Sequence, residues 1–368
     1  MEATFSDLSG YDAPGMHPWA PIVVRRADIE RHIDDLAAAA APDRGIRAVR
    51  MVHPQSPPNV HALAPTIACE LHVLLPGETT APMRHNAAEV SLCLRGRGQV
   101  TIGREIIRFV RNDVWNAPAM HYFSYRNADT ELTAWLTFSN AALLETMGIH
   151  YVEHAAAPAV PHTEALEAGS ETAASPERKL PPPIFLENGT QMLTYEHLVA
   201  PEIVENQAHH WRWDDIVPFA HEMFDGDKNR NFGRRGIFAL YNPATGRLKG
   251  ATHSFFAAWG YLPGDVIDFP HRHTSSAIVY CMEGDQISEV DGQRLYWGAG
   301  DIAYTAPNWA AHANGSQRGS VSFIVQDHPL QIGLEALLWQ EGDDKPIRLL
   351  GGEQGFVPDD SVVLGGAG

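Results

Sequence analysis

Two stretches of the chain repeat the same order of residue types, and this repeat constrains the fold more than any other feature. Residues 75–85 contain LPGE followed by PMRH, and residues 262–273 contain LPGD followed by PHRH. Farther on, NDV before AP at 112–118 corresponds to GDI before AP at 300–307, with a shift of one residue. An internal duplication of about 110 strand-rich residues is the simplest explanation.

The repeated units read as β-structure. With 368 residues the chain is long for one core, so two domains are expected. The 26 Pro and 31 Gly suit many short strands joined by turns. Apolar runs typical of strands lie at 67–75, 90–94, 99–102, 106–110, 132–138 and 255–269. The turn at 95–98 predicts a hairpin between the second and third of these runs. One helix is predicted at 29–41, capped by Asp28 and ended by Pro42.

The predicted order of segments follows from these patterns. Between the two strand-rich units lies a stretch rich in Ala, Pro, Glu and Ser with little periodicity, which is typical of a linker. We therefore predict an N-terminal arm and helix (1–45), a first strand-rich domain (46–150), a linker and lead-in (151–205), a second strand-rich domain (206–345) and a C-terminal tail (346–368).

Composition excludes some partners. The net charge is −18 and no block of Lys or Arg stands out, so a nucleic-acid partner is not expected. No apolar run reaches the ~18–20 residues that span a bilayer, and residues 1–3 do not begin a signal pattern. The three cysteines are widely spaced in strand-like runs, which predicts buried free thiols and a cytoplasmic location.

The second repeat unit carries a candidate metal site. His271 and His273 stand two apart on a predicted strand, so both side chains point to one face. His312 is the third candidate ligand, and neutral imidazoles suit Fe(II), Mn, Ni, Zn or Cu. In the first unit Met83 stands where His271 stands and Phe123 where His312 stands.

A reduced first site stays open as an alternative, because His85 corresponds to His273, Glu89 follows His85 by four residues, and His121 is offset by two residues from the position that corresponds to His312. The other interpretation of these residues is a first unit that serves as scaffold and packs against the second.

The duplicated pattern of His-x-His, a glycine turn, Gly-Asp, Pro and a final His resembles the cupin superfamily. The resemblance implies an all-β chain of two double-stranded β-helix barrels, a bicupin, with the metal inside a barrel. Many cupins add a Glu four to six residues after His-x-His, and residues 274–279 contain none. The second unit therefore predicts a three-His site without a carboxylate, which disfavours oxalate-type decarboxylation.

A closer resemblance covers about residues 209–328. WRW at 211–213, LYNP at 240–243, HRHT at 271–274 and PNWAAHANG at 307–315 are similar to the gentisate 1,2-dioxygenase family and its relatives acting on salicylate and 1-hydroxy-2-naphthoate. The family implies an Fe(2+) ring-cleaving dioxygenase, here with iron on the three histidines of the C-terminal cupin. It also implies O2 and a small aromatic substrate with adjacent hydroxyl and carboxylate, and a homo-oligomer, a dimer or tetramer.

The same resemblance assigns further residues and marks departures. In this family the active metal usually lies in the N-terminal cupin, whereas here it is expected in the C-terminal one. The family often carries an Arg where this chain has Val279, so another cation would have to hold the substrate carboxylate. Arg235 is the first candidate and Arg234 the next. The remaining pocket candidates are aromatic: Phe256, Trp259 and Trp309.

Two other functions remain open at this point. One is a different metal-dependent cupin enzyme, an oxidase or isomerase of a specialised pathway. The other is a non-catalytic bicupin that binds a small ligand.

Overall fold

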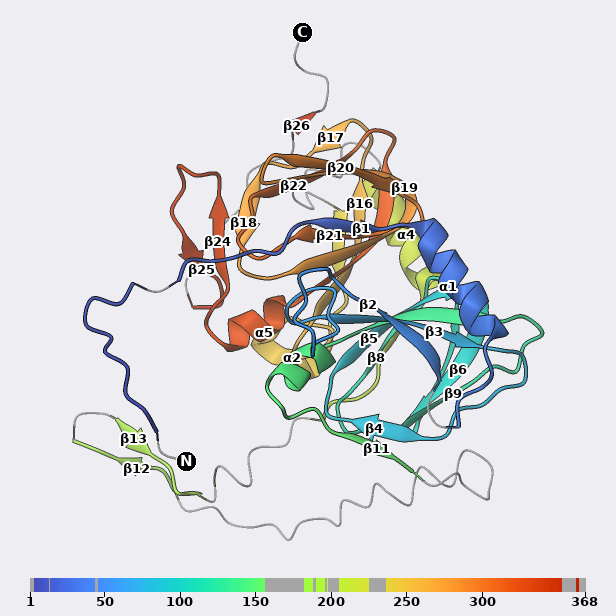
Figure 1. The fold of residues 1–368 in the computed structure, drawn as a ribbon, viewed down its shortest axis with the longest axis horizontal. Coiled ribbons are helices and arrows are strands. Elements are labelled where there is room, and N and C mark those ends of the chain that lie inside the picture. The colour runs from blue at the N-terminus through green and yellow to red at the C-terminus, as the bar shows by residue number, and fades with distance from the viewer. Residues whose placement is uncertain are drawn as a thin grey trace.

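The computed structural model describes residues 3–12, 14–43, 46–155, 182–187, 190–195, 197, 205–224, 236–352 and 362–363. These residues form mainly antiparallel β-strands with a few short helices, and the strands close into two barrels (Figure 1). The prediction of an all-β chain with short helices is confirmed. Much of the predicted linker and all of 353–361 lie outside the described residues, so the domain boundaries stay predictions.

The first barrel has two sheets that enclose its interior. One has the strand order β14-β8-β5-β10-β3-β2, and the other has the order β11-β4-β9-β6-β7. The elements are β2 (Arg47–Met51), β3 (Ala68–Leu74), β4 (Met83–His85), β5 (Glu89–Arg95), β6 (Arg97–Ile102), β7 (Glu105–Val110), β8 (Val114–Ala117), β9 (Phe123–Arg126), β10 (Thr133–Ser139), α2 (Ala141–Thr146), β11 (Val152–His154) and β14 (His210–Trp211).

The second barrel is one curled sheet with the path β15-β16-β23-β19-β22-β18-β24-β25. Its elements are β15 (Gly236–Ala239), β16 (Phe256–Leu262), β17 (Val266–Ile267), β18 (His271–His273), β19 (Ala277–Val290), β20 (Gln293–Gly298), β21 (Ile302–Ala306), β22 (His312–Ser316), β23 (Ser320–Gln326), α5 (His328–Gly333), β24 (Leu338–Glu341), β25 (Arg348–Leu349) and β26 (Val362–Val363). Strand β1 (Ile22–Val24) joins the same sheet by pairing with β21. Outside the barrels lie α1 (Arg26–Ala38), the β12–β13 pair (Ile184–Phe185, Gln191–Met192), α4 (Trp213–Phe224) and the 3-10 helix η2 (Pro243–Leu248).

The hairpin predicted from the turn at 95–98 is wrong. Strand β5 pairs with β8 and β10, whereas β6 pairs with β7 and β9 in the other sheet. Gly96 lies between them with φ of 72°, and a Cβ there would be 2.3 Å from the Leu132 carbonyl oxygen. The backbone therefore bends at a glycine that no other residue can replace without strain, and it crosses between sheets instead of doubling back.

The predicted helix exists, but it begins and ends three residues earlier than expected. Helix α1 runs from Arg26 to Ala38, so Asp28 lies in its first turn and does not cap it. A carboxylate in the first turn still complements the partial positive charge of the helix N-terminus. The buried face is the one that the periodicity predicted: Ile29, Ile33 and Leu36.

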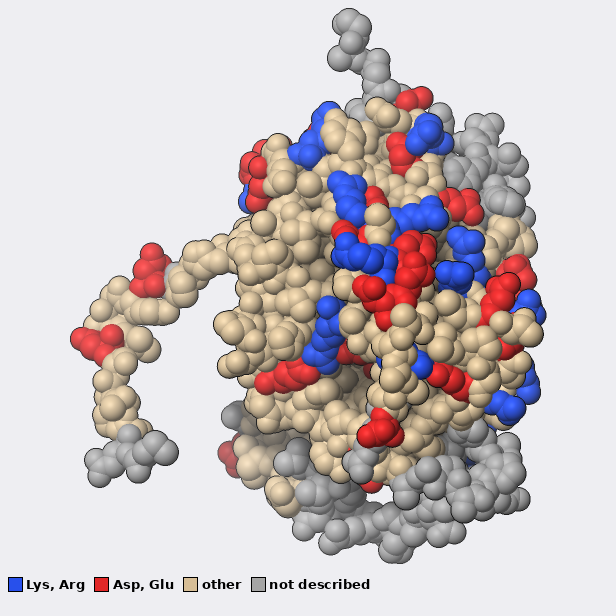
Figure 2. Space-filling view, turned by 45° about the vertical axis from the view of Figure 1, so that its right-hand side comes forward, with Lys and Arg blue, Asp and Glu red and all other residues tan. Residues whose placement is uncertain are grey.

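The N-terminal segment connects the two barrels. Strand β1 pairs with β21 of the second barrel, while the buried face of α1 joins a core cluster that contains residues of both barrels. Arg25 forms an ion pair with Asp301 at 3.0 Å. Figure 2 shows basic and acidic side chains intermixed on one part of this face, beside a broad area with few charged residues. Within the described residues, no helix is long and apolar enough to cross a membrane.

The two barrels share one hydrophobic core. In the first barrel, alternate residues of β3 and β10 face outward toward the second barrel, among them Leu71 and Phe138. Phe323 and Trp259 on β23 and β16 belong to the same cluster, and the rings of Phe138 and Phe323 lie 6.0 Å apart. Because side chains alternate along a strand, the remaining residues of these strands line the barrel interiors.

Replacing Phe138 with alanine should destabilise the whole molecule. Phe138 is fully buried in the shared core, so its loss should lower the free energy of unfolding by about 3–5 kcal/mol. Urea unfolding followed by fluorescence would measure the change. Phe185→Ala is the control, since Phe185 is exposed and should leave stability almost unchanged. Loss of stability in one barrel only, with an unchanged transition for the other, would contradict a shared core.

Candidate metal centre

Three histidines converge inside the second barrel. His271 and His273 lie on β18, and His271 is paired across the sheet with His312 on β22. One ligand nitrogen from each ring lies within 4.8 Å of the others, and all three residues are buried. The sequence analysis predicted this trio, and the structure brings its three members together.

The backbone fixes which ring nitrogen of each histidine can bind a metal. Nδ1 lies 3.2 Å from the Phe269 carbonyl oxygen in His271, 2.9 Å from that of Ser275 in His273 and 2.9 Å from that of Ala310 in His312. A carbonyl only accepts, so each Nδ1 is assigned as the N–H donor. This tautomer leaves Nε2 as the coordinating atom in all three rings, which is how ligand histidines are commonly oriented.

An aromatic residue that sequence reasoning did not find lies against two of the ligands. Trp339 on β24 stacks on His271 with 4.7 Å between ring centroids and on His273 with 5.2 Å. Strand β24 pairs with β18, so Trp339 stands directly opposite His273. The sequence carried no signal for this contact, since Trp339 lies beyond the final motif and only the strand register places it here.

Among the predicted pocket residues, Phe256 is connected to the trio through one intervening ring, that of His328. Its ring is 6.0 Å from that of His328, which in turn is 5.1 Å from His273. The Ser275 hydroxyl lies 2.8 Å from Nδ1 of His273 and 3.2 Å from Nδ1 of His328. Burial and the nearby His273 hold the pKa of His328 well below its usual range, so this imidazole is neutral.

The other predicted pocket residues lie elsewhere. Val279 packs in an apolar cluster of the barrel interior with Cys281 and Trp297. Trp259 is three positions from Phe256 on the same strand, so it faces the shared core between the barrels. Trp309 lies under the guanidinium of Arg272 at 5.5 Å, and Arg272 alternates away from the two histidines of its strand. The predicted carboxylate-binding residues, Arg235 and Arg234, lie outside the described residues.

The alternative site in the first barrel is not assembled as a metal site. Nε2 of His85 lies 3.0 Å from a Glu89 oxygen, and Nδ1 of His85 lies 3.1 Å from the Ala87 carbonyl oxygen. His121 is exposed and its Nδ1 contacts the backbone of Ala119. Both nitrogens of His85 are therefore used within the protein, and His121 does not join them.

Comparison with known proteins agrees with these features. No protein-family model matches the chain. A gentisate 1,2-dioxygenase from Streptomyces sp. is 30% identical over 155 residues, which are 41% of this chain and 39% of that protein. A 5-nitrosalicylic acid 1,2-dioxygenase from Bradyrhizobium sp. is 29% identical over 138 residues, 36% of this chain and 65% of that protein. Over these segments the chain is similar to 1,2-dioxygenases that are named for gentisate and for 5-nitrosalicylic acid.

The similarity of fold extends over almost the whole chain. The salicylate 1,2-dioxygenase from Pseudaminobacter salicylatoxidans matches with a TM-score of 0.71 and 15% identity, covering 92% of each chain. A point mutant of that enzyme in complex with gentisate also matches with a TM-score of 0.71, at 16% identity over 90% of this chain and 88% of the other. At this identity the structural match establishes the bicupin fold. The aligned segments span less than two thirds of either curated relative.

Removing one histidine of the trio should abolish metal retention. His312→Ala takes away one of three converging Nε2 atoms, so bound metal after dialysis should fall at least tenfold relative to the unchanged chain. His85→Ala is the matched control and should leave the metal content unchanged, because His85 is bonded to Glu89 and Ala87. Elemental analysis of the purified proteins measures both. Equal losses in the two variants would contradict this assignment, and loss in His85→Ala alone would place the metal in the first barrel.

Proposed function

We propose that the protein is a non-haem Fe(II) dioxygenase that cleaves the ring of an aromatic compound with neighbouring hydroxyl and carboxylate groups. The observation that carries the proposal is the buried trio of His271, His273 and His312, whose Nε2 atoms converge while each Nδ1 is bonded to the backbone. The named activities of the two curated relatives, on gentisate and on 5-nitrosalicylic acid, supply the substrate class.

The donor set fits a divalent first-row metal. Three neutral imidazoles on one side of an ion leave positions for other ligands, and within the described residues no carboxylate completes the cluster. When bound, Fe(II) would supply Lewis-acid and redox chemistry, joining a chelating substrate and O2 on one centre. The ring would provide all four electrons that O2 requires, so the reaction needs no external reductant.

The residues around the trio would hold the ligands and keep water away. The backbone carbonyls of Phe269, Ser275 and Ala310 fix the ring orientations, so the three Nε2 atoms are preorganised before any ion binds. Trp339 stacks on two of the rings and gives the site an apolar side. An apolar enclosure strengthens every electrostatic contact to a bound substrate.

The substrate carboxylate needs a cation, and Val279 cannot supply one. We propose Arg235 for this role, with Arg234 as the second candidate, because the family resemblance gives that segment this task. A charge-assisted hydrogen bond contributes about 1.5–3 kcal/mol, which corresponds to roughly ten- to a hundredfold in binding.

Self-association is part of the same proposal. Figure 1 shows the N-terminal segment extending away from the barrels. All of residues 3–12 are exposed, and Phe5, Leu8 and Tyr11 are among them. An exposed apolar arm would find a burial place on a second copy in a dimer or tetramer.

Oxygen uptake by the iron-loaded protein tests the function. Salicylate, gentisate, 5-nitrosalicylate and 1-hydroxy-2-naphthoate would be compared, and at least one should drive O2 consumption with stoichiometric loss of the ring chromophore. Iron-loaded His312→Ala should be inactive. Metal retained without O2 uptake on any of these compounds would favour another metal-dependent cupin reaction, and absence of metal would favour a ligand-binding bicupin.

Loss of Arg235 should affect substrate binding more than turnover. Arg235→Ala should raise KM about ten- to a hundredfold, and Arg235→Lys should recover part of the loss because it restores the charge. Arg318→Ala is the control, since Arg318 is an exposed cation paired with Asp285. An unchanged KM in Arg235→Ala would remove this residue from the carboxylate site.

A further inference from the structure

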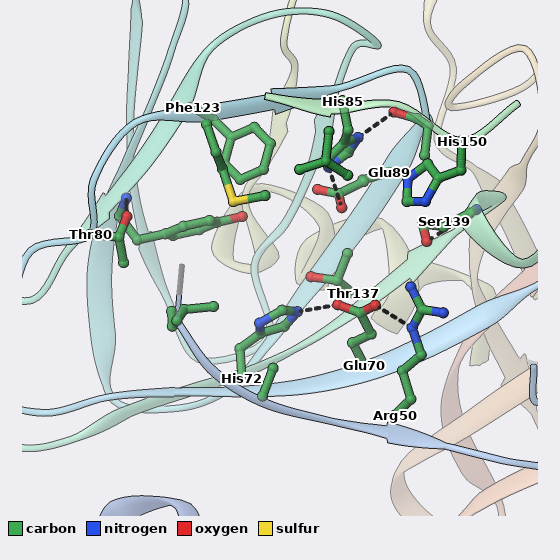
Figure 3. Close-up of a pocket in the computed structure, with 17 residues that line it drawn as sticks. Arg50, Glu70, His72, Thr80, His85, Glu89, Phe123, Thr137, Ser139 and His150 are labelled. Atoms are coloured by element: carbon green, nitrogen blue, oxygen red, sulfur yellow. Dashed lines mark hydrogen bonds and ion pairs between the residues drawn. The ribbon is translucent and has the colours of Figure 1, made fainter. Parts of the chain in front are cut away.

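The first barrel contains a cavity of about 240 Å³ between its two sheets (Figure 3). Strands β2, β3, β5 and β10 contribute one side, and β4, β9 and the segment leading into β11 contribute the other. An apolar protein cavity of about 150 Å³ holds benzene, so this volume suits one substituted ring. None of its lining residues belongs to the three-His cluster of the second barrel.

The strand register collects polar side chains along one wall. Arg50, Glu70 and Thr137 are cross-strand neighbours on β2, β3 and β10, and Ser139 is opposite Glu89 in the next row. Their alternate neighbours on these strands form the shared core, so the polar residues are directed into the barrel. Figure 3 shows Glu70 between His72 and Arg50, with Thr137 beside it.

Arg50 on β2 and His85 on β4, which line opposite sides of the cavity, are both already paired with carboxylates. Arg50 donates to Glu70 at 2.6 Å and to both oxygens of Glu145 at 2.9 Å. His85 lies 3.0 Å from Glu89. An anionic ligand would have to break one of these pairs and leave a buried carboxylate without its partner, which is costly.

The partners of Glu70 and His85 shift the pKa values of both groups toward their charged forms. Burial favours protonation of Glu70, but His72 and Arg50 outweigh it and lower the pKa of Glu70 to about 2. Burial disfavours the charged form of His85, yet attraction to Glu89 raises the pKa of His85 above its usual value. Glu70 is therefore a carboxylate near neutral pH, and the shift at His85 favours its charged form beside Glu89.

The cavity lining, taken over both sides, includes groups that can accept a hydrogen bond. Burial lowers the pKa of His150, so the ring is neutral, and its Nδ1 lies 3.5 Å from a Glu145 oxygen. Nε2 of His150 is then an acceptor, and it is buried without a hydrogen-bond partner among the described residues. The nitrogens of His72 are also without a hydrogen bond there, although Nε2 lies 3.3 Å from Glu70.

The side formed by β4, β9 and β11 also carries apolar residues. Met83 and Phe123 lie there, at the positions that correspond to His271 and His312 of the second barrel, together with Val152, while His85 and His150 line the same side. Within the described residues, three metal-ligating atoms within 4.8 Å of one another occur at the His trio and not in this cavity. The lining therefore suits an organic molecule with a flat apolar face better than a metal ion.

We infer that the first barrel is a separate, metal-free binding site for an uncharged single-ring aromatic that carries hydroxyl or amino donors. The ring would lie against Phe123 and Met83, and its donors would face Glu70, Glu89 and His150. This ligand class differs from the aromatic carboxylate of the proposed reaction. The inference does not depend on that reaction, because it rests on the first barrel alone.

Calorimetric titration of the full-length protein with two ring-sized probes tests the inference. Resorcinol carries two hydroxyl donors, no charge and no adjacent pair that chelates metal, and benzoate is an anion of similar size. Resorcinol should bind one per chain and at least tenfold more tightly than benzoate. Equal or tighter binding of benzoate, or no resorcinol binding by a folded protein, would overturn the inference.

Variants place the probe in the cavity. Ala48 lines the cavity and is exposed, so Ala48→Phe should obstruct it at little structural cost and reduce resorcinol affinity at least tenfold. His150→Leu removes one acceptor and should weaken binding about two- to tenfold. His121→Leu, an exposed histidine of the same barrel, is the matched control and should change nothing.

His312→Ala separates the two barrels in the same assay. Resorcinol affinity should be unchanged in this variant, whatever its effect on metal or activity. Affinity lost in His312→Ala and kept in both Ala48→Phe and His150→Leu would assign the probe to the metal centre and refute a first-barrel site. Circular dichroism of each variant confirms that the chain has folded.

Discussion

The structure depends on the alternation of side chains along the strands between the two barrels. One face of each of these strands packs into the shared core, and the other face lines the interior of a barrel. On β3 and β10, one set of residues packs into the core between the barrels and the other set lines the first barrel. On β16 and β23 the same rule sends Trp259 and Phe323 into the shared core. A shift of one residue in register would exchange the two sets, burying Glu70 in the shared core and directing apolar residues into the barrel.

The interiors of the two barrels differ in the side chains that fill them. The second keeps three histidines at one end and fills the space near Val279 with apolar side chains, which leave a void of about 20 Å³ there. The first has Met83 and Phe123 at the corresponding ligand positions and retains a roomier cavity with a polar wall. Its remaining histidine, His85, is held by Glu89 and Ala87. One duplicated fold thus supports a metal centre in one copy and an organic-ligand site in the other.

Much of this was predictable from local sequence. The repeat predicted two similar β-rich units. The spacing of His271, His273 and His312 predicted the trio, because it reflects the two-residue period of a strand and a recurring sequence motif. The crossing at Gly96 was not predictable in the same way, since a short glycine turn between two apolar runs is also typical of a hairpin. Which strands pair is decided by contacts distant in sequence, here by the approach of Leu132 to Gly96.

The neighbours of the site illustrate the same limit. Trp339 reaches the histidines only through the register of β24 on β18, and the polar wall of the first barrel exists only because β2, β3 and β10 align Arg50, Glu70 and Thr137. As an aromatic residue, Trp259 was a reasonable candidate to line the pocket. Its side chain instead points to the face of β16 that packs into the shared core. Residue type suggested candidates, and strand register decided among them.

The metal of this bicupin is expected in its C-terminal barrel. Anomalous diffraction at the iron absorption edge, from crystals of the iron-loaded protein, tests it most directly. One anomalous peak per chain is expected, adjacent to the Nε2 atoms of His271, His273 and His312. A peak beside His85 and Glu89 in the first barrel, or no peak at the trio, would contradict it.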